Sequence, residues 1–163
     1  MEPIAANSST PTVVDFQTGS TAGKITITIK LTLADSGEDV TPASLTPLSI
    51  TIPVGPPVIN SASLSRSGKS MQVVVVGYSP TRDMTQATFH FVPTTGNTLK
   101  TTDVTVTLSD VFTTWYQGTN SDQFGTQFTY TQPFTLDSDA SVISSVTVTL
   151  SNSQGASQPA TAQ

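Results

Sequence analysis

Few residues in this sequence are suited to acid–base or nucleophilic chemistry. His90 is the only histidine, cysteine is absent, and the two glutamates and nine aspartates are spread along the chain. His90 stands between Phe89 and Phe91, and the alternation of a strand places its ring on the face opposite the two phenyl rings. Serine catalysis needs an activated serine, and no G-x-S-x-G turn occurs. We therefore expect no catalytic residue and no enzyme.

Two kinds of stretch imitate ligand-binding loops. The letters "SGKS" at residues 67–70 match the end of a phosphate-binding loop, but Ser63 stands where that loop needs its first glycine, so a hairpin turn is predicted. Acidic residues gather at 35–39 and at 137–139 without the twelve-residue pattern of a calcium loop. One histidine and no cysteine leave no ligand set for zinc. The sequence predicts no metal site and no cofactor.

Aromatic side chains are concentrated in one stretch. Seven of the eleven lie between residues 111 and 134: Phe112, Trp115, Tyr116, Phe124, Phe128, Tyr130 and Phe134. The last three share the parity of a strand with one buried face, and the first two have the spacing of one helix face. Tyr116 and Phe124 have no such inward assignment. They are the candidates for aromatic side chains that face a ligand.

The composition is typical of an all-β protein. Threonine and serine account for 51 of the 163 residues, whereas only 10% of residues are charged. Threonine is β-branched and suits the half-exposed surface of a sheet. The net charge of −5 and the scattered lysines and arginines argue against nucleic-acid binding, which needs clustered positive charge. The longest apolar run, residues 73–76, is too short to span a membrane.

Alternating apolar and polar residues predict several half-buried strands. The stretch "KITITIKLTL" places five aliphatic residues on one face, a candidate inter-subunit strand face: Ile25, Ile27, Ile29, Leu31 and Leu33. The pattern recurs in "PLSITIPV", "DVTVTL" and "SVTVTLSN", and "QATFHFV" is expected to bury Ala87, Phe89 and Phe91. The run "MQVVVVGY" is apolar on both faces and indicates a central strand. Weaker strands are expected at 12–16 and 38–41.

One short helix is predicted near residues 110–117. The aromatic residues of "VFTTWYQ" recur at i, i+3 and i+4, which is the spacing of one helix face. Ser109 and Asp110 are both candidate N-caps, and Gly118 is expected to end the helix.

Prolines divide the chain into two segments. Pro53, Pro56 and Pro57 favour a short, extended connection. Residues 58–163 contain about seven predicted strands, enough for a complete antiparallel sandwich with a flexible C-terminal tail. Residues 1–57 contain three or four, too few to bury an apolar face alone. They pair into one larger sandwich, or form the trailing half of a truncated module, or are completed by a strand from another chain.

The stretch "PPVINSASLSRSGKSMQVVVVGYSPTRDMTQATFHFVP" resembles the immunoglobulin-like repeat modules of large bacterial secreted and cell-surface proteins. Such modules often begin with a proline-bounded strand and continue with a V-x-V-x-G strand, as "VVVVGYS" is here. In the first segment, "TAGKITITIKL" is similar to "SSVTVTLSN" in the second. The resemblance implies an all-β, antiparallel immunoglobulin-like β-sandwich preceded by a partial module. It also implies a role outside the cytoplasm as a spacer, adhesin segment or fibre component.

Three functions remain open. The first is a non-catalytic structural or adhesive module, extracellular or at the cell surface, with neighbouring modules or identical subunits as partners. The second is a self-assembling extracellular filament subunit joined by inter-subunit strand complementation on the aliphatic face of residues 24–33. The third is a carbohydrate-binding module that presents Tyr116 and Phe124 to a surface polysaccharide.

Overall fold

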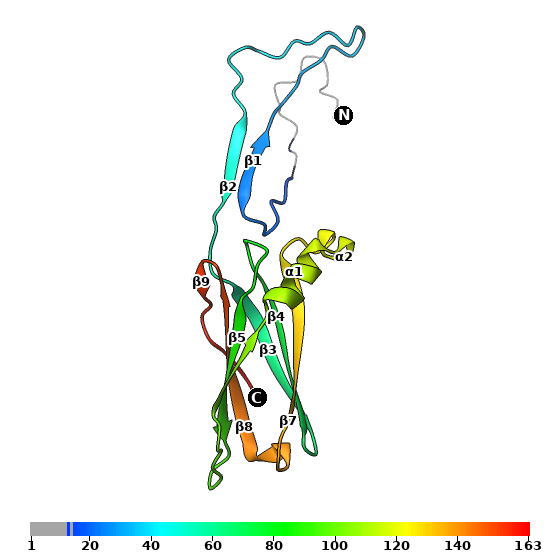
Figure 1. The fold of residues 1–163 in the computed structure, drawn as a ribbon. Helices are drawn as coiled ribbons and strands as arrows, with labels where there is room; N and C mark the ends of the chain where they lie inside the picture. The colour runs from blue at the N-terminus through cyan, green and yellow to red at the C-terminus, as the bar shows by residue number, and fades with distance from the viewer. Residues whose placement is uncertain (1–12, 14) are drawn as a thin grey trace.

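The chain forms a two-stranded ribbon followed by a two-layer, sandwich-like body (Figure 1). The structure is a computed structural model that describes residue 13 and residues 15–163. Every strand pair in it is antiparallel, which confirms the predicted all-β class. Residues 12 and 14 of the weak strand expected at 12–16 lie outside the described residues.

The ribbon consists of β1 (Gly23–Ile27) and β2 (Leu48–Ile52). Ile25 lies opposite Ile50, and Ile27 lies opposite Leu48. Because side chains alternate along each strand, the aliphatic residues of both strands share one face.

The strand predicted over residues 24–33 ends at Ile27, because β2 offers only five residues for pairing. Residues 28–47 form a long connection instead. Within it, Thr32 and Asp39 make an isolated antiparallel bridge. The strand expected at 38–41 is thus reduced to this single bridge.

Two sheets make up the body. The first has the order β3-β4-β7, with bounds Val58–Ser67, Ser70–Tyr78 and Gln127–Thr135. The second has the order β10-β8-β5-β6, with β9 beside β8. In chain order its strands are β5 (Gln86–Pro93), β6 (Asp103–Thr107), β8 (Ile143–Asn152), β9 (Gly155–Ala156) and β10 (Ala160–Ala162). The central place of β4 in its sheet confirms the prediction for residues 73–76.

One apolar core lies between the two sheets. Phe134 of β7 meets the rings of Phe89 and Phe91 of β5 edge-on, each at a centroid distance of 5.1 Å. Burial of such a side chain contributes roughly 1.5–3 kcal/mol. The prediction for "QATFHFV" is confirmed. The most deeply buried residues of β4, β5 and β8 are Met71, Val73, Val75, Ala87, Phe89, Val146, Val148 and Leu150.

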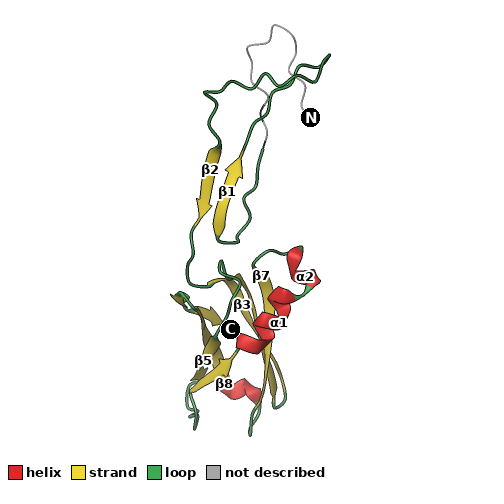
Figure 2. Cartoon of the chain, turned by 45° about the horizontal axis from the view of Figure 1, so that its top comes forward, coloured by secondary structure: helices red, strands yellow, loops and turns green. Residues whose placement is uncertain are grey.

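Three short helices close the ends of the body (Figure 2). They are α1 (Ser109–Gln117), α2 (Thr119–Asp122) and the 3₁₀ helix η1 (Ala140–Val142). The predicted helix is confirmed, and Gly118 ends it as expected. Neither Ser109 nor Asp110 is the N-cap. That position is Leu108, which makes no side-chain capping bond and is only 1% exposed, so the helix begins where the core holds the chain.

The C-terminal residues belong to a sheet, so the predicted flexible tail is wrong. In β10, Ala160 pairs with Val148 and Ala162 pairs with Val146. The Leu150 N–H donates a hydrogen bond of 3.0 Å to the Ser157 Oγ atom. The small side chains of β10 gave no alternation of large apolar residues that would have indicated a strand.

Gly77 allows a close approach of two strands. A Cβ atom at Gly77 would lie 2.3 Å from the Val58 carbonyl oxygen, next to the bulge in β3. We predict that Gly77→Ala lowers the free energy of unfolding by about 1–3 kcal/mol, because β3 has to shift. Gly23→Ala is the control, since a Cβ there meets nothing within 4 Å. Chemical denaturation measures both variants, and wild-type stability of Gly77→Ala would contradict the close approach.

Candidate functional site

A buried asparagine ties the chain after β2 to the body. Asn152 ends β8 and is 6% exposed. Its Nδ2 group lies 2.9 Å from the Gly55 carbonyl oxygen and 3.0 Å from both the Ser79 Oγ and Thr81 Oγ1 atoms. Gly55 belongs to the proline-rich connection. The Asn152 side chain therefore fixes the point at which this connection meets the body.

A second tie holds the chain just before β1. The Ala22 N–H donates a hydrogen bond of 2.8 Å to the Pro80 carbonyl oxygen. The Ser20 and Thr126 hydroxyl groups also form a hydrogen bond. Together with the contact between Asn152 and Gly55, we call these contacts the junction. Both ends of the ribbon are thus attached to the same end of the body (Figure 1).

Asp83 organises the loop that carries the junction. Partial burial opposes its ionisation, but hydrogen bonds from the Thr81 hydroxyl group and the Ser153 N–H outweigh this and lower the pKa of Asp83 below its usual value. The Ser79 hydroxyl group donates to the Asp83 carbonyl oxygen at 2.6 Å. The carboxylate is therefore ionised at neutral pH and stabilises this loop.

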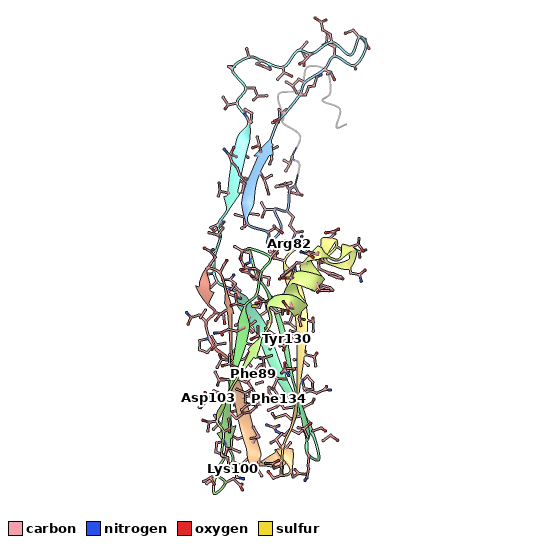
Figure 3. All side chains as sticks on the ribbon, in the orientation of Figure 1. Arg82, Phe89, Lys100, Asp103, Tyr130 and Phe134 are labelled. Atoms are coloured by element: carbon pink, nitrogen blue, oxygen red, sulfur yellow. The ribbon has the colours of Figure 1, made fainter. Side chains whose placement is uncertain are left out.

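Arg82 connects the same loop to the helices. Its backbone is in the left-handed region with φ of 55°, which is costly for a residue with a side chain. The guanidinium group donates to the Tyr116 carbonyl oxygen and, at 3.1 Å, to the Ser121 hydroxyl group. It also lies 5.5 Å from the centre of the Tyr116 ring. These contacts offset the backbone strain and fix α1 and α2 against the body (Figure 3).

Tyr116 is part of the core, so its prediction as a ligand-facing aromatic residue is wrong. It is 7% exposed, and its hydroxyl group donates a hydrogen bond of 2.9 Å to the Thr126 carbonyl oxygen. Burial raises the pKa of Tyr116 well above its usual value. On this helix the i, i+4 spacing with Phe112 faces inward, and both rings are buried.

Phe124 is exposed, as the sequence predicted. It is 54% exposed and stacks on Trp115 with a centroid distance of 6.2 Å and an interplanar angle of 23°. Beside it lies a groove of about 460 Å³ between the segment before β1 and the segment before β7. The groove is lined mainly by amides and hydroxyl groups, among them Gln17, Thr18, Ser20, Thr21, Gln123 and Gln127.

A second cleft, also of about 460 Å³, lies at the end of the body remote from the ribbon. Met71, Phe91, Phe134 and Ile143 form its apolar floor. Lys100 lies at this end of the body in Figure 3. No predicted site residue lies in this cleft.

The aliphatic face of the ribbon is only partly covered. Ile25, Ile27 and Leu31 are half-buried, whereas Ile29 is 55% exposed and Leu33 is 47% exposed. Ile29 and Leu33 lie beyond the end of β1, so the structure does not assemble all five predicted residues into one strand face.

The side chains that could in principle act as acids, bases or metal ligands instead form a surface ion pair or stabilise turns. His90 Nδ1 lies 2.8 Å from Asp103 Oδ1, across two paired strands, and both side chains are more than half exposed. In the acidic turns, Asp39 accepts a hydrogen bond from the Thr41 N–H, and Asp139 accepts one from the Ser141 N–H at the start of η1. Across the described residues, no three potential metal ligands come together.

Comparisons with protein-family models, with curated proteins and with solved structures find no match to this chain. Membership of the immunoglobulin-like repeat family stays a prediction. Within the described part of the chain, no helix has both the length and the apolar character needed to cross a membrane.

Sequence reasoning missed the junction. Asn152 ends a stretch that the sequence predicts as a strand, and Ser79 and Arg82 lie in a stretch that it marks only as a turn. The available signal was weak: "GYSPTRD" and "LSNSQG" carry more side-chain donors and acceptors than a tight turn requires. The partner of Asn152, Gly55, is distant in the sequence and offers only a backbone carbonyl group.

Tyr116 makes the helical end sensitive to alkaline pH. Its raised pKa means that the neutral phenol stabilises the folded state fully below about pH 10, and that this stability is lost as the pH rises above that value. We predict that Tyr116→Phe costs about 0.5–1.5 kcal/mol at neutral pH through the lost hydrogen bond, and that it reduces the alkaline loss of stability. Thermal unfolding between neutral and alkaline pH tests this, with Tyr78→Phe as the control. An unchanged alkaline profile would contradict it.

Proposed function

We propose that the chain is a non-catalytic structural module of an extracellular or cell-surface protein, with a structural or adhesive role and neighbouring modules as its partners. The observation that carries this proposal is the junction. Hydrogen bonds on both sides of the ribbon, at Ala22 and Gly55, attach it to one end of the body. A spacer that holds neighbouring modules in a defined orientation needs such a fixed connection, because a flexible linker leaves neighbouring modules free to move.

Strand order supports an immunoglobulin-like module. The strands β3, β4 and β7 take the places of strands A, B and E of that fold. The strands β10, β8, β5 and β6 correspond to G, F, C and C′ in the opposing sheet. The helices α1 and α2 occupy the connection between C′ and E. The residues of the V-x-V-x-G stretch lie on the central strand of the first sheet, where Gly77 permits close contact with β3.

The neutral, threonine-rich outer surface supports the same proposal. The outer faces of the sheets carry threonines, and some of these pair across strands, as Thr88 does with Thr105 and Thr147 with Thr161. Such neutral, hydroxyl-rich surfaces suit a spacer that is exposed to water and neighbouring molecules.

A rigid junction has a measurable consequence. We predict that a distance between spin labels at Ser36 in the ribbon connection and Ser67 at the far end of β3 shows one narrow distribution. Asn152→Ala should broaden it, because the Gly55 carbonyl group loses its donor. Asn120→Ala, at an exposed position on α2, is the control. A broad distribution in the wild-type chain would contradict the spacer function.

The groove beside Phe124 favours carbohydrate binding as a second candidate function. An exposed ring stacked on Trp115 offers a flat apolar surface, and the neighbouring amides and hydroxyl groups match the hydrogen-bonding groups of a neutral sugar. A surface polysaccharide is the corresponding partner.

Trp115 fluorescence provides the test of this second function. Titration with a panel of neutral oligosaccharides should change the fluorescence of the wild-type chain, and Phe124→Ala should weaken binding at least about tenfold, as loss of a stacking ring does. Val111→Ala, at an exposed position on α1, should bind like the wild type. An unresponsive wild-type chain would count against carbohydrate binding.

A further inference from the structure

The two sheets of the body end in unpaired strand edges on the same side. The strand β6 is the last of its sheet and β7 is the last of the other, and among the described residues each pairs along one edge only. On the opposite side, β10 lies close to β3, and Arg66 of β3 donates a hydrogen bond of 2.8 Å to the Ser144 carbonyl oxygen of β8. One side of the sandwich is therefore bridged, whereas the side of β6 and β7 is open.

The hydrogen bonds of β6 identify the main-chain groups that are free. The Phe91 N–H donates a hydrogen bond of 2.7 Å to the Thr102 carbonyl oxygen. At the other end of the strand, the Leu108 N–H donates one of 2.9 Å to the Thr85 carbonyl oxygen. Because alternate residues of an antiparallel strand bond to the same neighbour, the even-numbered residues of β6 bond to β5. The N–H and carbonyl groups on the open side belong to Asp103, Thr105 and Thr107.

The free edge of β7 is blocked, whereas that of β6 is not. The Leu136 N–H donates a hydrogen bond of 2.9 Å to the Lys69 carbonyl oxygen, so the even-numbered residues of β7 bond to β4. Pro133 therefore lies at the free edge, where its missing N–H disfavours the addition of a strand. The strand β6 has no proline, lysine or bulge, and its single charged residue, Asp103, is bonded to His90.

An apolar cleft lies directly beside the free edge of β6. Val104 lines the cleft of about 460 Å³ at the end of the body remote from the ribbon, together with Phe134 of β7. Val104 pairs with Phe89, which is 0% exposed, so this face of β6 points into the sandwich. Residues opposite each other in a sheet share a face. A strand added beside β6 therefore directs the side chain opposite Val104 into the cleft.

The cleft also carries an unpaired positive charge. Lys100 lines it from the segment before β6 and is exposed (Figure 3). Among the described residues, no carboxylate oxygen lies within 4.0 Å of its Nζ atom. Asp137 lines the cleft as well, from the segment after β7. Because β6 runs away from Lys100, an antiparallel strand beside β6 ends next to Lys100, and an acidic residue at that C-terminal end meets the ammonium group.

We propose that the free edge of β6 and the adjoining cleft bind an extended peptide segment of a partner protein. The segment adds to the sheet as an antiparallel strand, inserts a large apolar side chain opposite Val104, and places an acidic residue near Lys100. Main-chain hydrogen bonds supply affinity in such strand addition, and alternate side chains supply specificity. A second copy of β6 has only valines on its inward face and offers no large side chain for the cleft. The site is independent of the proposed function, because it includes neither the junction nor the ribbon.

A synthetic peptide tests the proposal. The blocked peptide Thr-Val-Thr-Phe-Thr-Thr-Glu, with a fluorescent label, places its phenylalanine opposite Val104 and its glutamate near Lys100. We expect it to bind the full chain saturably, as measured by fluorescence anisotropy. Exchange of the phenylalanine with the threonine that follows it moves the ring to the other face and should weaken binding at least about tenfold. The absence of saturable binding of the first peptide up to millimolar concentration would overturn the proposal.

Backbone methylation distinguishes strand addition from binding of an apolar group alone. N-methylation of the threonine opposite Thr105 removes the hydrogen bond to the Thr105 carbonyl oxygen and should weaken binding at least about tenfold. N-methylation of the phenylalanine is the matched control, since its N–H points away from β6 and its loss should leave binding unchanged. Equal affinity of the two methylated peptides would overturn the proposal and assign the cleft to a small apolar ligand.

Matched proline variants test the edge of the protein itself. Thr105→Pro removes an N–H from the free edge of β6 without removing a hydrogen bond to β5, and should weaken peptide binding at least about tenfold. Thr129→Pro, at the corresponding kind of position on β7, should bind like the wild type. Circular dichroism checks that both variants fold, and the methylated peptides test the same contact in the wild-type chain. Unchanged binding by a folded Thr105→Pro variant would contradict the proposed edge.

Charge variants and sedimentation complete the test. Lys100→Ala should weaken binding of the glutamate peptide but not of the same peptide with glutamine, and Lys69→Ala, at another exposed lysine, should leave both unchanged. Equal effects of Lys100→Ala on the two peptides would overturn the assigned acidic residue. Sedimentation should show no self-association through β6. A concentration-dependent dimer that Thr105→Pro abolishes and Thr129→Pro retains would overturn the proposed partner and favour a second copy of this chain.

Discussion

Strands that alternate apolar and polar residues give a sheet one apolar face, and exposure of that face to water is unfavourable. The two halves of this chain cover their apolar faces to different extents. In the body, β8 lies between β10 and β5 and against the opposing sheet, and its inward side chains are fully buried. In the ribbon, among the described residues, β1 pairs only with β2, and Leu48 opposite Ile27 is 61% exposed. Where neighbouring strands and an opposing sheet cover a strand, its apolar side chains form the core. In the ribbon, where this covering is incomplete, the aliphatic face stays partly exposed.

The junction determines how the two halves are connected. It is built from polar groups: the Asn152 amide, the Gly55 and Pro80 carbonyl groups and the Ala22 N–H. Because a buried hydrogen-bonding group is costly to leave unpaired, such contacts specify one arrangement more strictly than apolar contacts do. Asp83 and Arg82 support the loop beneath it through hydrogen bonds to Ser153 and to the helices. The position of the ribbon therefore depends on the fold of the body.

The sequence predicted those features that depend on local patterns. Alternation identified the strands that became β1, β2, β5, β6 and β8, the continuous apolar run at residues 73–76 identified β4, and the aromatic spacing identified α1. Features that depend on distant partners were not accessible in this way. The strand β10 consists of small residues that are ordered only by pairing with β8, Tyr116 faces inward only because of how α1 lies on the core, and Asn152 finds Gly55 across 97 positions of the chain.

Amide hydrogen exchange of the full chain tests the central claim, that β1 lacks the covering that β8 has. The residues to compare are 24–27 of β1 and 146–150 of β8. A hairpin without a covering sheet opens locally more often than a covered strand, so the amides of β1 should exchange about a thousandfold or more faster than those of β8. Equal protection of the two strands would show that the ribbon is already covered, and would contradict the account.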